Sequence, residues 1–237
     1  MSHAAPCLCA RTEGFIRMAR YEWDFGAAFL HPHLWLHALA ITVGYAAATI
    51  VVGLLIGVAL GMMLLSRFWI VRLPAGGFVQ LFRCTPLLIQ IIWFYYALPV
   101  AISVTIPAWL AAGMGLSFYM GAFSAEIFRG GIMSIDKGQW QAAKALGMVP
   151  WQVMQRIVLP QATRRMMPPF VNQSVLQLKN TSLLSVVAVP DLMYTAQTFV
   201  SETFRPLEIY TVLAIVYLAI LYPLQKLAKL LERRDDI

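Results

Sequence analysis

This sequence has unusually few charged residues. Only 12% of its 237 residues are Asp, Glu, Lys or Arg, about half of the ~25% usual in soluble domains, and 60% are hydrophobic. A disordered chain needs the opposite composition, and the 15 glycines and 13 prolines are spread too thinly for a linker protein. The composition predicts an all-α, polytopic membrane protein.

Cysteine and acidic residues are also scarce. Cys7, Cys9 and Cys84 lack the CxxC spacing of a zinc site and give no disulfide framework. With 18 basic against 11 acidic residues the net charge is +7, which in a soluble protein would suggest nucleic acid. In a membrane protein, basic loops facing the cytoplasm explain it better, so no nucleic-acid partner is expected. His33 and His37 could share a helix face, but we interpret them as interfacial residues and expect no metal site.

Enzyme motifs are absent as well. No lysine follows a glycine, so the phosphate-binding pattern GxxxxGK[ST] is missing, and HExxH, GxSxG and paired-carboxylate motifs do not occur. We therefore expect no catalytic residues and no cofactor bound by this chain. Any ATP hydrolysis, with its ATP-Mg, has to take place on a separate partner subunit.

Long uncharged windows locate the membrane spans. Residues 25–66 and 84–125 contain no charged residue, and each window is about twice the ~20 residues that one helix needs. The stripe Gly53, Gly57 and Gly61 favours close packing against another helix. Five transmembrane helices are predicted, at Leu36–Leu65, Pro74–Leu98, Pro107–Ile127, Met166–Val189 and Ile209–Leu231.

The domain organisation follows from these spans. We expect an N-terminal periplasmic tail (1–30), one transmembrane domain (31–232) with a cytoplasmic loop at 136–160, and a cytoplasmic tail (233–237). The first 24 residues lack the apolar core of a signal peptide, and Met18 is an alternative start. The positive-inside rule puts the N-terminus outside, where Arg11, Arg17, Arg20 and Arg205 fall. The cytoplasmic side collects Arg67, Arg72, Arg129, Lys137, Lys144, Arg156, Arg164, Arg165, Lys226, Lys229, Arg233 and Arg234.

The cytoplasmic loop is built like a structured element. Strong helix formers end at Gly147, and Pro150 suits the first turn of a second helix. The spacing predicts two short amphipathic helices with a glycine corner. Such a pair either rests on lipid or docks a soluble partner, and we favour docking.

The same loop carries a family resemblance. Gln141-Ala142-Ala143, then Gly147, then Ile157-Val158-Leu159-Pro160 have the spacing of the EAA loop of ABC importer permeases, with Gln141 in place of Glu. Residues 82–90, 125–132 and 178–183 resemble the FRGTPLLVQ, AEIFRGGI and KNTSL segments of polar amino-acid permeases of the histidine, glutamate, glutamine and arginine type.

The resemblance implies a type I ABC importer fold in the bacterial inner membrane. The expected partners are ABC ATPase subunits, a periplasmic amino-acid-binding protein, the lipid bilayer and a second permease subunit, giving a homo- or heterodimer. It also implies which residues couple to the ATPase, namely Gln141, Ala142, Ala143, Gly147, Trp151, Ile157, Leu159 and Pro160.

Polar residues at membrane depth are expensive and are the natural candidates for a substrate pathway. An ion pair of Arg83 with Glu126 and capture of a substrate carboxylate by Arg83 are equally good interpretations. The two cations Arg83 and Lys179 favour a polar amino acid with an acidic or amide side chain. The predicted pathway residues are Arg83, Thr85, Glu126, Lys179, Asn180, Thr181 and Ser182.

Two further expectations concern the outer segment and the energy source. Asp191, Glu202, Arg205 and Glu208 are interpreted as a solvated loop rather than as contacts to a binding protein. A secondary transporter driven by an ion gradient is the alternative function. Five spans and a single docking loop disfavour it, because such transporters usually have more spans or an internal repeat.

Overall fold

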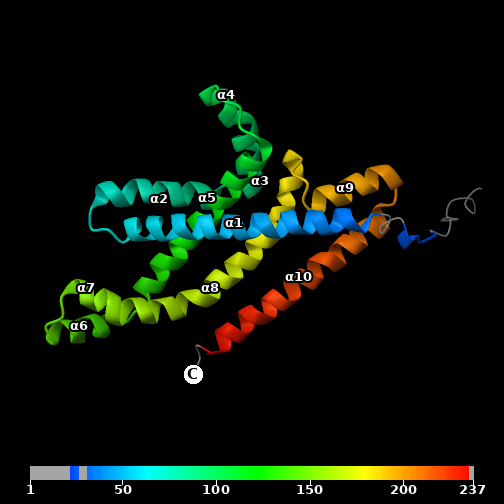
Figure 1. Ribbon diagram of the computed structural model, residues 1–237. Helices are drawn as coiled ribbons and strands as arrows, with labels where there is room; N and C mark the ends of the chain where they lie inside the picture. Colours follow the sequence, from blue (N-terminus) through cyan, green and yellow to red (C-terminus); the bar gives the residue numbers. More distant parts are fainter. Residues whose placement is uncertain (1–21, 27–30, 235–237) are drawn as a thin grey trace, which may run out of the picture.

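The computed structural model describes residues 22–26 and 31–234, and the described chain is helical without strands (Figure 1). Most of the expected N-terminal tail, with Cys7, Cys9 and Met18, lies outside the described residues, as does the end of the C-terminal tail. The main helices are α1 (Pro32–Leu64), α2 (Trp69–Cys84), α3 (Leu87–Ile92), α4 (Leu98–Ile102), α5 (Ala108–Met133), α6 (Lys137–Ala145), α7 (Pro150–Val153), α8 (Leu159–Asn180), α9 (Leu192–Thr203) and α10 (Pro206–Arg234).

The pair of α1 and α5 forms the centre of the bundle. A Cβ atom on Gly53 would collide with Met120, and one on Gly57 with Ser124 of α5. These glycines let the two backbones approach closely, as small residues do between membrane helices. The predicted packing role of the glycine stripe is therefore confirmed.

The apolar helices agree with a membrane protein. By length and hydropathy α1 and Pro206–Lys226 are candidate spans, and the number rises to as many as four if each of two bent helix pairs counts as one span. Helix α5 lies close to the segment expected at 107–127 and packs between α1, α2 and α8. The all-helical polytopic architecture is thus the predicted one.

The second predicted span is wrong as a single straight helix. The chain bends by 108° between α2 and the α3–α4 limb. Pro86 disfavours the helical conformation of Thr85, which is extended at φ −98° and ψ 139°. The Gln90 side chain donates to the carbonyls of Phe82 at 2.9 Å and of Thr85 at 3.0 Å, which stabilises the elbow. The limb, with a π-helical turn at Trp93–Ala97, stands away from the bundle in Figure 1.

The fourth predicted span is much longer than expected. From Pro150 the helix runs through a π-turn (Met154–Val158), α8 and a 3-10 segment (Thr181–Val187), on the order of 55 Å at ~1.5 Å per residue. Pro160, about three turns into this rod, has no backbone N–H to donate, and the wider π-turn lies directly before it. The second loop helix and the fourth span are therefore one continuous element. Since ~20 residues cross the bilayer, the rod already spans it before residue 187.

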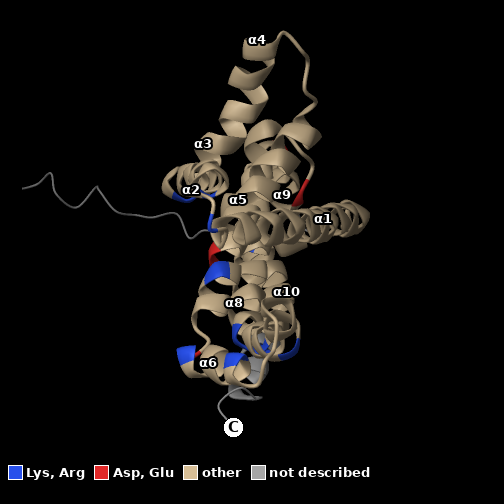
Figure 2. Cartoon of the chain, turned by 90° about the vertical axis from the view of Figure 1, so that its left-hand side faces the viewer, with Lys and Arg blue, Asp and Glu red and all other residues tan. Residues whose placement is uncertain are grey.

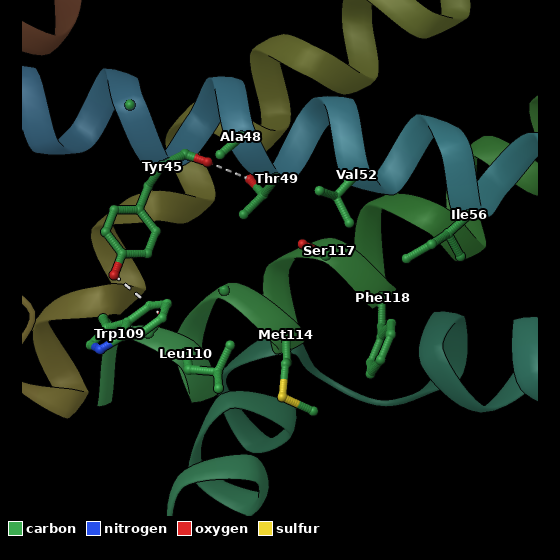
Figure 3. Close-up of a pocket in the computed structure, with 12 residues that line it drawn as sticks. Tyr45, Ala48, Thr49, Val52, Ile56, Trp109, Leu110, Met114, Ser117 and Phe118 are labelled. Atoms are coloured by element: carbon green, nitrogen blue, oxygen red, sulfur yellow. Dashed lines mark hydrogen bonds between the residues drawn. The ribbon is translucent and has the colours of Figure 1, made fainter. Parts of the chain in front are cut away.

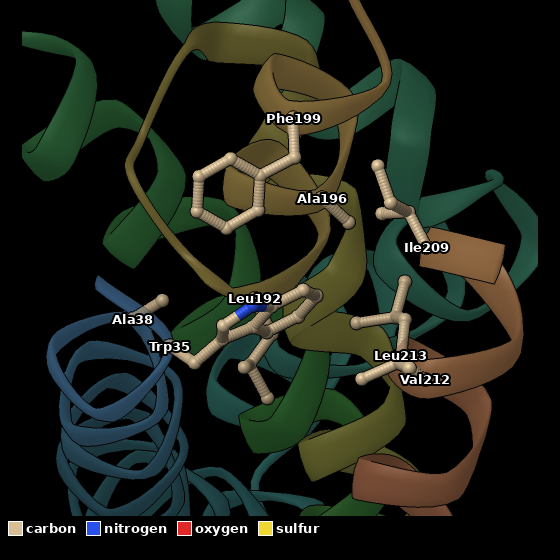
Figure 4. Packing of buried hydrophobic residues seen from close by; sticks show 8 residues of the cluster. All are labelled: Trp35, Ala38, Leu192, Ala196, Phe199, Ile209, Val212 and Leu213. Carbon is tan, nitrogen blue, oxygen red and sulfur yellow. The ribbon is translucent and has the colours of Figure 1, made fainter. Parts of the chain in front are cut away.

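The solvated loop expected between the last two spans is wrong at two residues. It contains helix α9, and Asp191 and Glu208 are fully buried. Asp191 caps α9 because its Oδ1 accepts from the backbone N–H of Tyr194 at 2.8 Å. Apolar side chains from α1, α9 and α10 pack around this corner (Figure 4): Trp35, Ala38, Leu192, Ala196, Phe199, Ile209, Val212 and Leu213.

Candidate functional site

The predicted coupling loop ends in an exposed apolar tip. Helix α6 is capped by Asp136, whose side chain accepts from Gly138 N–H at 2.6 Å, and the chain then turns at Gly147 with φ +74°. Around that corner Leu146, Val149 and Trp151 are 80%, 54% and 67% exposed. We call these three residues the apolar tip. The glycine corner between two helices is as predicted, but Leu146 and Val149 of the tip are missing from the predicted coupling residues, which include only Trp151.

The inner face of the loop is buried against the bundle. Ala143, Val153 and Val158 are at most 2% exposed and share a hydrophobic cluster with Ile132 and Met166. The small side chain of Ala143 allows α6 to pack there. Of the other predicted coupling residues Ile157 is half-buried, and the exposed ones are Gln141, Ala142, Gly147, Trp151, Leu159 and Pro160.

A charge cluster joins α2 to α5. Arg83 Nη1 lies 3.9 Å from Glu126 Oε1, and the Arg83 guanidinium lies 5.4 Å from the centre of the Phe123 ring. Glu126 Oε2 accepts from Arg129 Nη2 at 2.7 Å and from Arg129 Nε at 3.2 Å. The two arginines therefore share one carboxylate, and Arg129 holds it more closely.

Cavities open beside two of the predicted pathway residues. Glu126 lines a cavity of about 320 Å³ together with Gly131, Ser134 and Arg165, and the guanidinium of Arg165 donates to the Ser134 carbonyl. Thr85 lines a more apolar cavity of about 400 Å³ in the elbow between α2 and α3, beside Trp93. The polar cavity is thus the one continuous with the charge cluster.

A larger cavity of about 530 Å³ lies between α1 and α5 (Figure 3). Its walls are mostly apolar, with Val52, Ile56 and Phe118 among them. Its polar edge includes Tyr45, whose hydroxyl donates to the Trp109 carbonyl at 3.2 Å. None of the predicted pathway residues lines it.

The remaining pathway residues lie where α8 becomes the 3-10 segment. Lys179 is exposed and Asn180 is half-buried, while Thr181 is fully buried. The hydroxyl of Thr181 donates to Leu178 O at 2.7 Å and that of Ser182 to Lys179 O at 2.9 Å. The structure brings Arg83 and Glu126 together. It shows no hydrogen bond or ion pair from this turn to them within the described residues, so a shared pathway stays a prediction.

Comparison with known proteins decides the family. Residues 50–235 match the family model described as "Binding-protein-dependent transport system inner membrane component". The chain belongs to this family. It is 34% identical to the glutamine transport system permease protein GlnP of Escherichia coli K12, over 91% of the chain and 99% of the relative. It is 36% identical to the octopine permease protein OccM of Rhizobium meliloti, over 84% and 87%.

Solved structures agree. The chain superposes on an amino acid ABC transporter crystallised with histidines with a TM-score of 0.85 and 30% identity, covering 90% of the chain and 100% of the other. The MetNI methionine ABC transporter, at 17% identity and a TM-score of 0.72, shares the fold. The chain is thus a transport permease component of an amino-acid ABC importer with the type I fold.

Proposed function

We propose that this permease imports a polar amino acid with an acidic or amide side chain by alternating access. A periplasmic binding protein delivers the substrate, and loop 136–160 couples the bundle to a separate ATPase that binds ATP-Mg. A second permease subunit, identical or paralogous, completes the pathway. The observation that carries the proposal is the apolar tip, whose Trp151 lies on α7, the helix that continues into α8.

The tip has the properties of a docking surface. Leu146, Val149 and Trp151 expose apolar area at a corner whose inner face is packed, and a groove on a partner would bury it. Because α7 and α8 are one rod, a displacement of the tip would move the spanning part of the helix as a rigid body. That is the motion that alternating access requires.

The distribution of charge supports the proposed orientation. Basic residues gather around α6 and the neighbouring end of α8 (Figure 2). Lys137 and Lys144 belong to α6, Arg156 to the π-turn and Arg164 to α8. We assign this end to the cytoplasm of a bacterial inner membrane, which leaves the N-terminus outside. The tip then faces the compartment that holds the ATPase.

The substrate class rests on two cations. Arg83 is 39% exposed and makes only a 3.9 Å contact to Glu126, so a substrate carboxylate can replace that contact. Lys179 is exposed and forms no ion pair within the described part of the chain. Together they favour a substrate whose side chain is acidic or an amide. The names of the glutamine-transporting relatives fit this class.

Uptake by reconstituted transporter tests the proposal. Proteoliposomes with the permease, its ATPase and its binding protein are given labelled glutamine, glutamate or arginine. We expect uptake of an acid or amide, and at least tenfold lower uptake with Arg83→Ala or Lys179→Gln while the ligand affinity of the binding protein is unchanged. Lys226→Gln, on the far end of α10, is the matched control. Preferred uptake of arginine, or wild-type rates in both pathway variants, would refute the substrate class or the site.

A further inference from the structure

Asp191 is a buried carboxylate with half of its hydrogen-bonding capacity unused. It is 0% exposed and lies between the 3-10 segment and α9, past the end of the spanning rod. Its Oδ1 caps α9 through the N–H of Tyr194, whereas Oδ2 is buried without a hydrogen-bond partner in the described chain. Capping therefore accounts for one oxygen only.

Three other elements enclose this carboxylate. Thr42 of α1 accepts from the backbone N–H of Leu192 at 3.1 Å, directly beside Asp191. Tyr217 of α10 lies within range of the Asp191 charge and beside Thr181, and its hydroxyl is buried without a partner of normal geometry. The titratable side chain that faces Asp191 is thus Tyr217 from α10, while Tyr194 of α9 contributes its backbone N–H. Thr42 and Thr181 contribute only hydroxyls, and no described Lys, Arg or His pairs with Asp191.

An ionised carboxylate in this position needs compensation by a positive species. A metal ion needs several ligands and space, but no group of three His, Cys, Asp or Glu occurs among the described residues, and the three cavities above have other walls. A proton needs only the free Oδ2. Burial also raises the pKa of Asp191 to about 6, which outweighs the opposing effect of the backbone N–H groups.

We propose that Asp191 is a proton-binding site that fixes α9 to α1 and α10. A proton taken from water forms an O–H bond at Oδ2 and neutralises the carboxylate, whose charge otherwise acts on the nearby Tyr217 hydroxyl. Oδ1 keeps its role as the cap of α9. Release of the proton to water leaves a buried charge that opposes the packing of this corner. The site is separate from the coupling tip and does not depend on the proposed substrate.

The sign of the effect follows from linkage. The pKa of Asp191 is raised in the folded state, so stability is full below the unfolded-state value near 3.8 and is lost as the pH rises toward about 6. The unfolding constant should rise roughly tenfold per pH unit across this interval and level off above it. Other carboxylates titrate in the same range, so the difference from a matched variant is the quantity to measure.

The experiment uses the full chain in lipid nanodiscs, with the thermal midpoint measured from pH 4 to 8. In Asp191→Asn the amide side chain has nearly the shape of the protonated carboxyl, keeps an oxygen that can cap α9, and carries an N–H donor in place of the O–H. The Asp191→Asn variant should lose the fall in thermal midpoint between about pH 4 and 6 that Asp191 causes. The variant Glu202→Gln, at an exposed position of α9, should keep that fall. An Asp191→Asn profile parallel to wild type would overturn the proposal.

Two further measurements keep the proposal testable if the first variant fails to fold or if a cation, not a proton, occupies the site. If Asp191→Asn does not fold, Tyr217→Phe replaces it, because loss of the hydroxyl should shift the pH at which stability falls, and an unshifted profile counts against the site. The series is repeated in sodium and in choline chloride. A thermal midpoint that depends on sodium concentration instead of pH would show that the buried carboxylate binds a metal cation, and would refute the proposed proton-binding site.

Discussion

The apolar tip gives the sharpest test of coupling. Trp151 is 67% exposed, and Trp69 at the start of α2 has the same exposed fraction of 67%. Burying the exposed part of a Trp side chain, on the order of 150 Å², stabilises a complex by about 4 kcal/mol at ~25 cal/mol per Å². Truncation of a central Trp in an interface typically costs about 2–4 kcal/mol, which corresponds to a roughly 30- to 1000-fold weaker Kd.

The assay is a titration of ATPase against permease in nanodiscs, followed by fluorescence and by ATP turnover. Trp151→Ala should weaken binding by at least 30-fold, whereas Trp69→Ala should leave it within about twofold, because α2 is not part of the tip. Equal affinities for the two variants would refute the assignment of the tip as the docking surface. A loss in Trp151→Ala accompanied by an equal fall in thermal midpoint would also refute it, since it would show unfolding of the loop.

The remaining predictions concern the packing of α1 on α5, the backbone conformation of Gly147 and the buried carboxylate of Glu208. Gly57→Leu should lower the thermal midpoint by several degrees because its side chain meets α5, whereas Gly44→Leu, with open space around it, should not. Gly147→Val should weaken ATPase binding, since φ +74° costs a β-branched residue about 1–2 kcal/mol, and Gly147→Asn should restore most of it. Glu208→Gln should destabilise by about 1–3 kcal/mol in chemical denaturation, because fully buried Glu208 accepts from Asp24 N–H and Arg205 at 3.2 Å; exposed Glu202→Gln should be neutral.

Local sequence signals predicted the features that depend on local chemistry. The spacing of Gly53 and Gly57 predicts one small face on a helix, and that face is where α5 packs. A glycine after strong helix formers predicts a left-handed corner, and Gly147 has it. In both cases residues within one or two turns contain all the information needed.

Features that depend on distant parts of the chain could not be predicted. The run around Thr85 and Pro86 is apolar on both sides, so hydropathy predicts one helix, although the X-Pro restriction bends the chain by 108°. An isolated acid between two spans normally faces water, and Asp191 looks like one until it is covered by α10 and by α1, whose Thr42 is 150 residues from Leu192. Burial of a single charge is a property of the assembled bundle.

The charge cluster shows which of two arginines holds Glu126 more closely. Glu126 makes two hydrogen bonds to Arg129, at 2.7 and 3.2 Å, and only a 3.9 Å contact to Arg83. Charge-assisted hydrogen bonds at normal distances are much stronger than a longer ion pair between half-exposed groups. Arg129 therefore holds the carboxylate, and the structural ion pair of α5 lies within that helix. Arg83 is left with an aromatic ring and a weakly shared anion, which leaves its guanidinium available for the substrate carboxylate that we propose it binds.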